Sequence, residues 1–83
     1  MDALRKRLLF RSLRRGTKES DLVIGGFARA CLSDLNDGQL RRFEALLDQN
    51  DADVLAWIIG LERPPPEFDT DILNLIRKHR DSR

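Results

Sequence analysis

The sequence predicts an all-α fold, a small five-helix bundle that forms a single domain over residues 1–83. Three observations support this prediction. Apolar residues recur every three or four positions through most of the chain, which is the period of an amphipathic helix. The alternation of apolar and polar residues that marks a strand is absent over any useful length. A chain of 83 residues also has the length of one domain.

The first helix is expected at about residues 2–14, where Leu4, Leu8 and Leu9 share a face. We expect Gly16 to end this helix, because glycine readily adopts the left-handed conformation of a helix C-cap. An arginine-rich segment with leucines at helical spacing is also typical of a mitochondrial presequence. Asp2 and the lack of a cleavage signal favour the alternative, in which the segment is part of the fold.

The second helix is expected at about residues 19–32 and contains two adjacent glycines, Gly25 and Gly26. Each glycine costs about 1 kcal/mol relative to alanine in a helix interior. Such a pair is typical of a close approach by another backbone or of a local bend. The residues expected on the inward face of this helix are Leu22, Val23, Phe27, Ala30 and Cys31.

The third and fourth helices have recognisable N-termini. Asn36 and Gln39 have the spacing of a capping box, which predicts a helix start at Asn36. Asn50 or Asp51 is expected to cap the fourth helix, and Asp51 and Asp53 suit the positive end of its dipole. The apolar residues expected to pack inward are Leu40, Phe43, Leu46 and Leu47, followed by Val54, Leu55, Ile58, Ile59 and Leu61.

The last part of the chain starts with the stiff, extended connector that residues 64–66 predict, all three being proline. A fifth helix is expected to begin near Asp69 or Thr70 and to fray over about residues 80–83. Its buried residues would be Ile72, Leu73 and Ile76. We further expect Trp57 and Cys31 to be core residues, and His79 to be a solvated tail residue.

Charge is divided unevenly along the chain. Residues 1–18 carry seven basic groups and one acid, whereas residues 19–83 carry eight basic groups and thirteen acids, so the net charges are +6 and −5. A basic leading helix could belong to a nucleic-acid-binding protein or to an antitoxin-like regulatory protein. The acidic remainder would repel phosphates, however, and Phe10 is the only aromatic ring in the basic segment.

Catalytic, metal and membrane functions find little support in the sequence. The chain has one histidine and one cysteine, which is too few for a zinc cluster and leaves only His79 as the base of a catalytic triad. Asp48, Asp51 and Asp53 lack the glycine and the closing glutamate of a calcium loop. No uncharged stretch approaches the ~20 apolar residues of a spanning helix. We therefore expect no enzyme, no bound metal and no membrane insertion.

The segment that joins the first two helices, residues 14–21, is the most unusual part of the chain. Its glycine, Gly16, would let another backbone approach closely. Arg14 and Arg15 offer planar guanidinium groups that suit carboxylates or carbonyls. Glu19 and Asp21 lie at a helix N-terminus, where negative charge is stabilised. Spacing alone still favours an ordinary solvated turn.

The motif Arg15-Gly16-Thr17-Lys18-Glu19, followed by Asp21, resembles the Arg-Gly-x-x-Glu motif of the succinate dehydrogenase flavinylation factors. These are small assembly proteins of bacteria and mitochondria. The resemblance covers about residues 5–62, and its downstream part is an ordered helical pattern. The residues that carry this pattern are Leu40, Phe43 to Asp48, Asp51, Asp53, Leu55 and Trp57.

The resemblance implies an assembly chaperone that is not an enzyme. Members of the family are five-helix bundles that bind the flavoprotein subunit of succinate dehydrogenase and, in some bacteria, of fumarate reductase. They promote covalent attachment of FAD to a histidine of that client, so the FAD belongs to the client and the factor needs no cofactor. The partner-binding residues that the resemblance implies are Arg15, Gly16, Glu19 and Asp21, with Arg7, Arg11 and Arg14 extending the contact along the first helix.

Partners and location follow from the same resemblance. We expect the partner to be one of these two flavoprotein subunits, with no nucleic acid bound, and the free protein to be a monomer. The absence of a cleavable extension favours the cytoplasm of a bacterium over the mitochondrial matrix.

Overall fold

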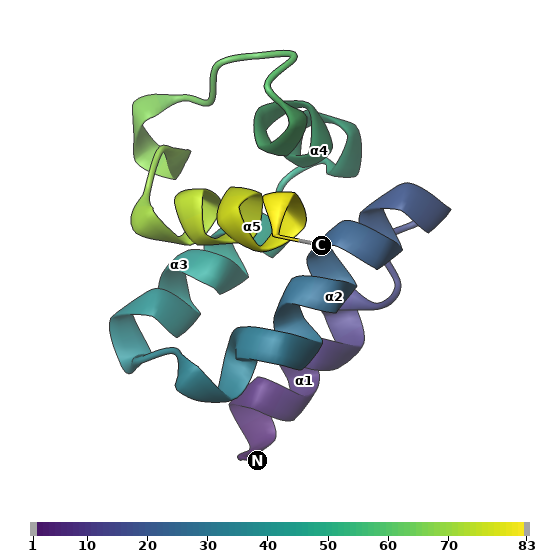
Figure 1. Cartoon of the computed structure of the whole chain (residues 1–83). Coiled ribbons are helices and arrows are strands. Elements are labelled where there is room, and N and C mark those ends of the chain that lie inside the picture. The colour runs from purple at the N-terminus through teal and green to yellow at the C-terminus, as the bar shows by residue number, and fades with distance from the viewer. Residues whose placement is uncertain (1, 83) are drawn as a thin grey trace.

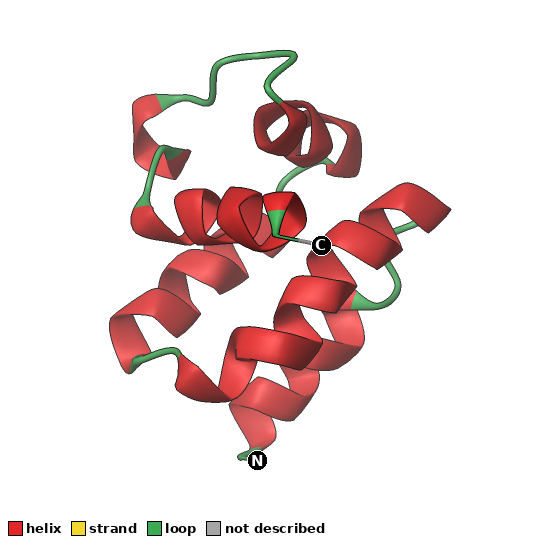
Figure 2. Cartoon of the chain, in the orientation of Figure 1, coloured by secondary structure: helices red, strands yellow, loops and turns green. Residues whose placement is uncertain are grey.

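The computed structural model describes residues 2–82, which form five α-helices and two short 3-10 helices (Figure 1 and Figure 2). The all-α prediction is confirmed, and this described part of the chain contains no strand. The elements in chain order are α1 (Ala3–Ser12), α2 (Lys18–Cys31), η1 (Leu32–Asp34), α3 (Asp37–Leu47), α4 (Asp51–Ile59), η2 (Pro66–Phe68) and α5 (Asp71–Asp81).

The helices pack around α5, which crosses the middle of the molecule. Figure 1 shows α1 and α2 side by side as an antiparallel pair, with α3 on one side of α5 and α4 on the other. α1 also contacts α3, and α5 contacts α2, α3 and α4. The connection between α4 and α5 leaves the body of the molecule and returns through η2.

The buried core draws on all five α-helices and on η1. All the apolar residues predicted to be buried in the third and fifth helices are buried, and so is Leu8 of α1. The leading segment is therefore part of the fold, as predicted. The buried apolar residues are Leu8, Val23, Ile24, Phe27, Ala28, Leu32, Leu35, Leu40, Phe43, Leu46, Leu47, Val54, Trp57, Ile58, Ile72, Leu73 and Ile76.

The predicted inward face of the second helix is partly wrong. Val23 and Phe27 are buried, but Leu22 is 52% exposed and Ala30 is exposed as well. The buried face is completed instead by Ile24 and Ala28. Successive residues are rotated by about 100° around the axis of a helix. Leu22 therefore lies opposite the face that buries Val23, Ile24, Phe27 and Ala28, and it points toward solvent.

The first helix ends earlier than predicted. Its C-cap is Leu13 in a right-handed conformation, so the prediction that Gly16 caps this helix is wrong. The end of α1 lies very close to α2. A Cβ added at Gly25 would lie only 2.8 Å from Leu13 Cδ2 and 3.3 Å from Ser12 O. The close approach predicted for the glycine pair is confirmed at Gly25. At Gly26 a Cβ would meet only His79 Nε2, at 3.9 Å.

Side-chain caps fix the helix starts. Asp2 accepts a hydrogen bond from the Arg5 backbone at 2.8 Å and caps α1. Asn36 and Gln39 form the predicted capping box of α3. Asn50 is the N-cap of α4 and accepts from Ala52 N at 2.9 Å.

The C-terminal half departs from the prediction in several places. Leu55, predicted to pack inward, is only half-buried, and Pro66, predicted in the extended connector, begins the 3-10 helix η2. Leu61 is 76% exposed, because α4 ends at Ile59 with Gly60 in the left-handed conformation at φ 86°. His79 is a helical residue whose ring packs against Phe27 at 6.1 Å between centroids, so it is not a solvated tail residue. α5 continues to Asp81, within the range where fraying is predicted. Arg83 lies outside the described residues.

Trp57 is a core residue, as predicted. It is buried, and its ring is stacked on that of Phe68 with 5.5 Å between the centroids. The α4–α5 connection therefore packs back onto the end of α4 through an aromatic pair. The backbone carbonyl of Trp57 also accepts a hydrogen bond from Arg77 Nη2 at 2.7 Å, which joins the end of α4 to α5.

Candidate partner-binding site

The candidate site is the short loop between α1 and α2, which holds the motif predicted from the sequence. Gly16 has φ 114°, a left-handed conformation that side chains other than glycine rarely adopt. A Cβ placed there would have no atom within 4 Å. The glycine is thus required by the backbone conformation, and the space above it is open to a partner.

Arg15 is directed into the protein, and its side chain is only 7% exposed. Nε donates to Asp51 Oδ1 at 2.9 Å, Nη1 donates to the carbonyl of Leu47, and Nη2 donates to the carbonyl of Gln49 at 3.1 Å. Leu47 ends α3, where carbonyl groups have no partner within the helix. The guanidinium group therefore joins the end of α3 to the start of α4, and the loop to both.

Asp51 is the second half of this anchor. It is the first residue of α4, where the helix dipole stabilises a negative charge. Its Oδ2 accepts from Ser20 Oγ at 2.6 Å and from Thr17 Oγ1 at 3.4 Å. Ser20 is fully buried. One carboxylate thus ties the loop and the first turn of α2 to the α3–α4 junction. We call Arg15, Asp51 and Ser20 the loop anchor.

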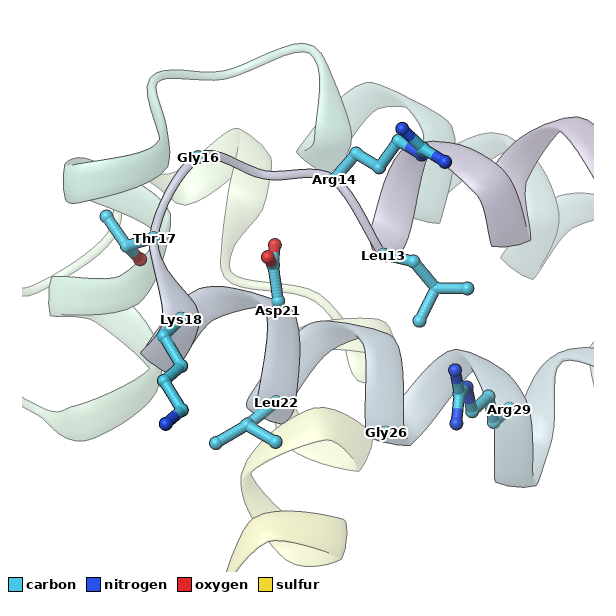
Figure 3. A pocket seen from close by; sticks show the side chains of 9 residues that line it. All are labelled: Leu13, Arg14, Gly16, Thr17, Lys18, Asp21, Leu22, Gly26 and Arg29. Carbon is cyan, nitrogen blue, oxygen red and sulfur yellow. The ribbon is translucent and has the colours of Figure 1, made fainter.

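The loop backbone is also held from α2. Thr17 is the N-cap of this helix and accepts from Ser20 N at 3.2 Å. Asp21 Oδ1 accepts from the backbone N–H of Arg15 at 2.7 Å. Figure 3 shows Asp21 pointing from α2 toward the loop. Asp21 is therefore a support of the loop conformation.

The other motif residues are directed outward. Glu19 and Lys18 are exposed at the start of α2, and Gly16 is exposed at the tip of the loop. Arg14 is exposed too, with its guanidinium carbon 4.6 Å above the centre of the Phe10 ring. The structure thus divides the predicted site in two, with Arg15 and Asp21 inside and the remaining residues on the surface.

Arg7 and Arg11, also predicted at the site, lie further back along α1 and face α3. Arg7 Nη2 lies 3.1 Å from Glu44 Oε2, and Arg11 Nη2 lies 2.6 Å from Asp48 Oδ1. Both charges are balanced within the chain. The sequence alone did not identify these pairs, because each joins residues that are 37 positions apart.

An open groove lies beside the loop, between the end of α1 and the outer side of α2 (Figure 3). It combines apolar and basic side chains with the backbone of the motif. The residues that line it are Leu13, Arg14, Gly16, Thr17, Lys18, Asp21, Leu22, Gly26 and Arg29.

The described residues also bear on the groups that reactive, metal-binding and membrane-spanning proteins need. Burial, together with the nearby Asp34, raises the pKa of the Cys31 thiol and so disfavours the reactive thiolate. Within residues 2–82, no group of three or more histidine, cysteine or acidic side chains could hold a metal ion. No helix in the same range is long and apolar enough to cross a membrane. The fold and the site define the class as a small helical bundle with an anchored, glycine-containing loop that is exposed at its tip.

Comparison with known proteins assigns the chain within this class. The family model described as flavinator of succinate dehydrogenase matches residues 6–80, and the chain belongs to this family. The resemblance inferred from the motif is confirmed, and the match continues beyond Trp57 into α5.

Similar proteins include succinate dehydrogenase assembly factors from several eukaryotes. The chain is 40% identical over 79 residues to the mitochondrial succinate dehydrogenase assembly factor 2 of Dictyostelium discoideum, covering 95% of this chain and 56% of that protein. It is 33% identical over 84 residues to the mitochondrial assembly factor 2-B of Drosophila mojavensis, covering 99% and 54%. For the mitochondrial assembly factor 2 of Drosophila grimshawi the identity is 34% over 77 residues, covering 90% and 52%. The chain spans about half the length of the curated relatives it matches.

These relatives correct the predicted location. All three are named mitochondrial, which points to the mitochondrion, so the prediction of a bacterial cytoplasmic protein is wrong. That prediction relied on the start of the sequence, and the start of a sequence does not decide the compartment.

Proposed function

We propose that this protein binds the flavoprotein subunit of succinate dehydrogenase and promotes the covalent attachment of FAD to a histidine of that subunit. Membership of the flavinator family supports the choice of partner. The observation that carries the proposal is the α1–α2 loop, which the loop anchor fixes from inside while Gly16 and Glu19 stay exposed. The protein acts as an assembly chaperone and not as an enzyme.

An anchored loop suits this task for an energetic reason. Ordering a flexible surface on binding costs conformational entropy, and a surface that is already fixed avoids most of that cost. The FAD belongs to the partner and supplies the covalent chemistry, so this chain needs no cofactor. Its contribution is to hold parts of the partner in a favourable orientation, an effect that can be large without any reactive group on the helper.

The exposed residues of the motif are proposed to contact the partner, and the inward-directed ones to hold the loop in place. Glu19 accepts hydrogen bonds from the partner, and Gly16 lets the partner backbone approach the loop tip. Arg15 and Asp21 act from inside by holding the loop conformation. Arg14 contacts the partner directly.

The proposal extends to the edge of the surface and to a second client. Arg7 and Arg11 lie at the edge and contribute less, because their charges are balanced by Glu44 and Asp48. A fumarate reductase flavoprotein would use the same surface. The free protein is a monomer.

The alternative, a nucleic-acid-binding or antitoxin-like regulatory protein, depended on the basic leading segment. Four of the seven basic residues in that segment form ion pairs within the chain, which weakens the electrostatic footprint that phosphates require. The four are Arg5, Arg7, Arg11 and Arg15.

The test is covalent flavin in the partner subunit, read by in-gel flavin fluorescence after incubation with FAD and this protein. Glu19→Ala should leave the circular dichroism spectrum unchanged and lower covalent flavin at least about tenfold, as expected for loss of a central contact. Gly16→Arg should also lower covalent flavin, but it strains the loop as well, because a side chain at φ 114° is unfavourable, so a lower free energy of unfolding is expected for this variant. Glu67→Ala, which removes an exposed acid on η2, is the matched control and should behave as the wild type. Normal flavinylation by both loop variants would contradict the site.

A further inference from the structure

Three basic side chains around the groove lack acidic partners. Arg14, Lys18 and Arg29 line it from the loop and from both ends of α2. Among residues 2–82, none of the three lies within ion-pair distance of a carboxylate. By contrast, Arg7, Arg11 and Arg15 are each paired with an acid of α3 or α4. Within residues 2–31, three of the four basic side chains that form no ion pair therefore lie at the groove, and the fourth is Lys6.

Part of the lining of the groove is apolar. Leu13 and Leu22 supply this part, and Gly26 contributes no side chain (Figure 3). The large apolar side chains that are exposed within the described residues are Phe10, Leu22 and Leu61. Leu22 lines the groove, whereas Phe10 lies under Arg14 and lines a second hollow that shares this arginine.

The contact between Arg14 and Phe10 has a further consequence. A guanidinium group stacked on an aromatic face keeps its charge, and its N–H groups stay free at the edge of the plane. The ring limits the positions of the long side chain, so less conformational freedom is lost when a carboxylate binds it.

We propose that the groove formed by Leu13, Arg14, Lys18, Leu22 and Arg29 is a docking site for an acidic segment of the partner flavoprotein. Carboxylates of that segment pair with the arginines and the lysine, and an apolar side chain between them packs on Leu13 and Leu22. The three basic side chains suit an anionic partner, and the apolar lining selects an acidic protein segment over nucleic acid, because a phosphate backbone would gain nothing from Leu13 and Leu22. The inference rests on the proposed function and names the part of the partner that is recognised.

Binding kinetics test the charged part of the proposal. The double variant Arg14→Glu/Arg29→Glu should bind the isolated flavoprotein subunit with an association rate about tenfold lower at low salt, and with a weaker salt dependence. The matched control is Arg41→Glu/Arg63→Glu, which makes the same charge change at exposed sites outside the groove. This control should lose less than about twofold in rate, since exposed charges away from a contact are screened.

The apolar part of the proposed contact is tested with a second variant and its own control. Leu22→Ala should raise the dissociation rate about threefold to fivefold, because it removes exposed apolar area from the contact. Leu61→Ala removes the same side chain at the other exposed leucine, which lies beyond α4, and should leave the rate unchanged. Circular dichroism and the urea midpoint establish that all four variants are folded. Arg14→Gln/Arg29→Gln replaces the charge reversal if that double variant does not fold.

The possible outcomes separate the two proposals. If the wild type does not bind the subunit, the proposed function fails. If the wild type binds and the groove variants match their controls, the docking proposal is overturned while the proposed function stands.

A titration with labelled duplex DNA and with single-stranded RNA tests whether nucleic acid occupies the groove instead. Tight, salt-dependent binding that the groove variants abolish would mean that the groove serves nucleic acid, and would also overturn the proposal.

Discussion

Arg14 and Arg15 are neighbours of the same residue type, and they lie in opposite environments. Arg14 is exposed over the Phe10 ring and has no acidic partner among the described residues. Arg15 is buried and bonded to three groups at the junction of α3 and α4. The loop therefore has an inner side that fixes its conformation and an outer side that is open to a partner. Adjacent charged residues of one motif can thus contribute to different properties, here stability and recognition.

The largest expected effect comes from breaking the inner side at Asp51. Asp51→Ala leaves Arg15 and Ser20 without their partner, and loss of one member of a largely buried pair costs about 3 kcal/mol. Urea denaturation should show this loss in the free energy of unfolding. Asp53→Ala is the control, because it removes an exposed acid from the same helical turn. Equal losses for the two variants would show that the helix dipole, and not the loop anchor, explains the effect.

A smaller effect is expected from the two glycines of α2, and its sign should differ between them. Gly25→Ala pushes against Leu13 and Ser12, and overpacking of this kind costs about 1–3 kcal/mol. Gly26→Ala meets no such contact, and alanine stabilises a helix interior by up to about 1 kcal/mol relative to glycine. Thermal unfolding followed by circular dichroism should therefore give a lower Tm for Gly25→Ala and a higher one for Gly26→Ala. Stabilisation by both substitutions would contradict the close packing of α1 on α2.

Local signals predicted much of the fold. The capping box of Asn36 and Gln39 and the apolar stripe of α3 depend on residues three or four apart, which a sequence displays directly. The error at Leu22 has a different cause. Apolar residues occupy more than half of the α2 circumference, so hydrophobicity alone does not decide which side faces the core. Contacts with α1 and α5 decide it.

The sequence indicates where along the chain the candidate site lies, but not which of its side chains point into the protein and which point outward. The motif residues come from one short segment, and its glycine suggests a left-handed backbone, which Gly16 adopts. The direction of Arg15 depends on Leu47, Gln49 and Asp51, which lie 32 to 36 positions further along the chain. Those contacts exist only once α3 and α4 have packed. For the same reason, the sequence indicates Asp51 as a residue of the helix start and of the family pattern, but not as the partner of Arg15.

The most direct measurement is the free energy of unfolding of Arg14→Ala and Arg15→Ala, determined side by side by urea denaturation. We expect Arg15→Ala to lose about 3 kcal/mol, because it leaves Asp51 Oδ1 and the carbonyls of Leu47 and Gln49 without this donor. Arg14→Ala should stay within about 0.5 kcal/mol of the wild type, as is usual for an exposed side chain. Equal losses for the two variants, or a larger loss for Arg14→Ala, would contradict the division of the loop into an anchoring side and a binding side.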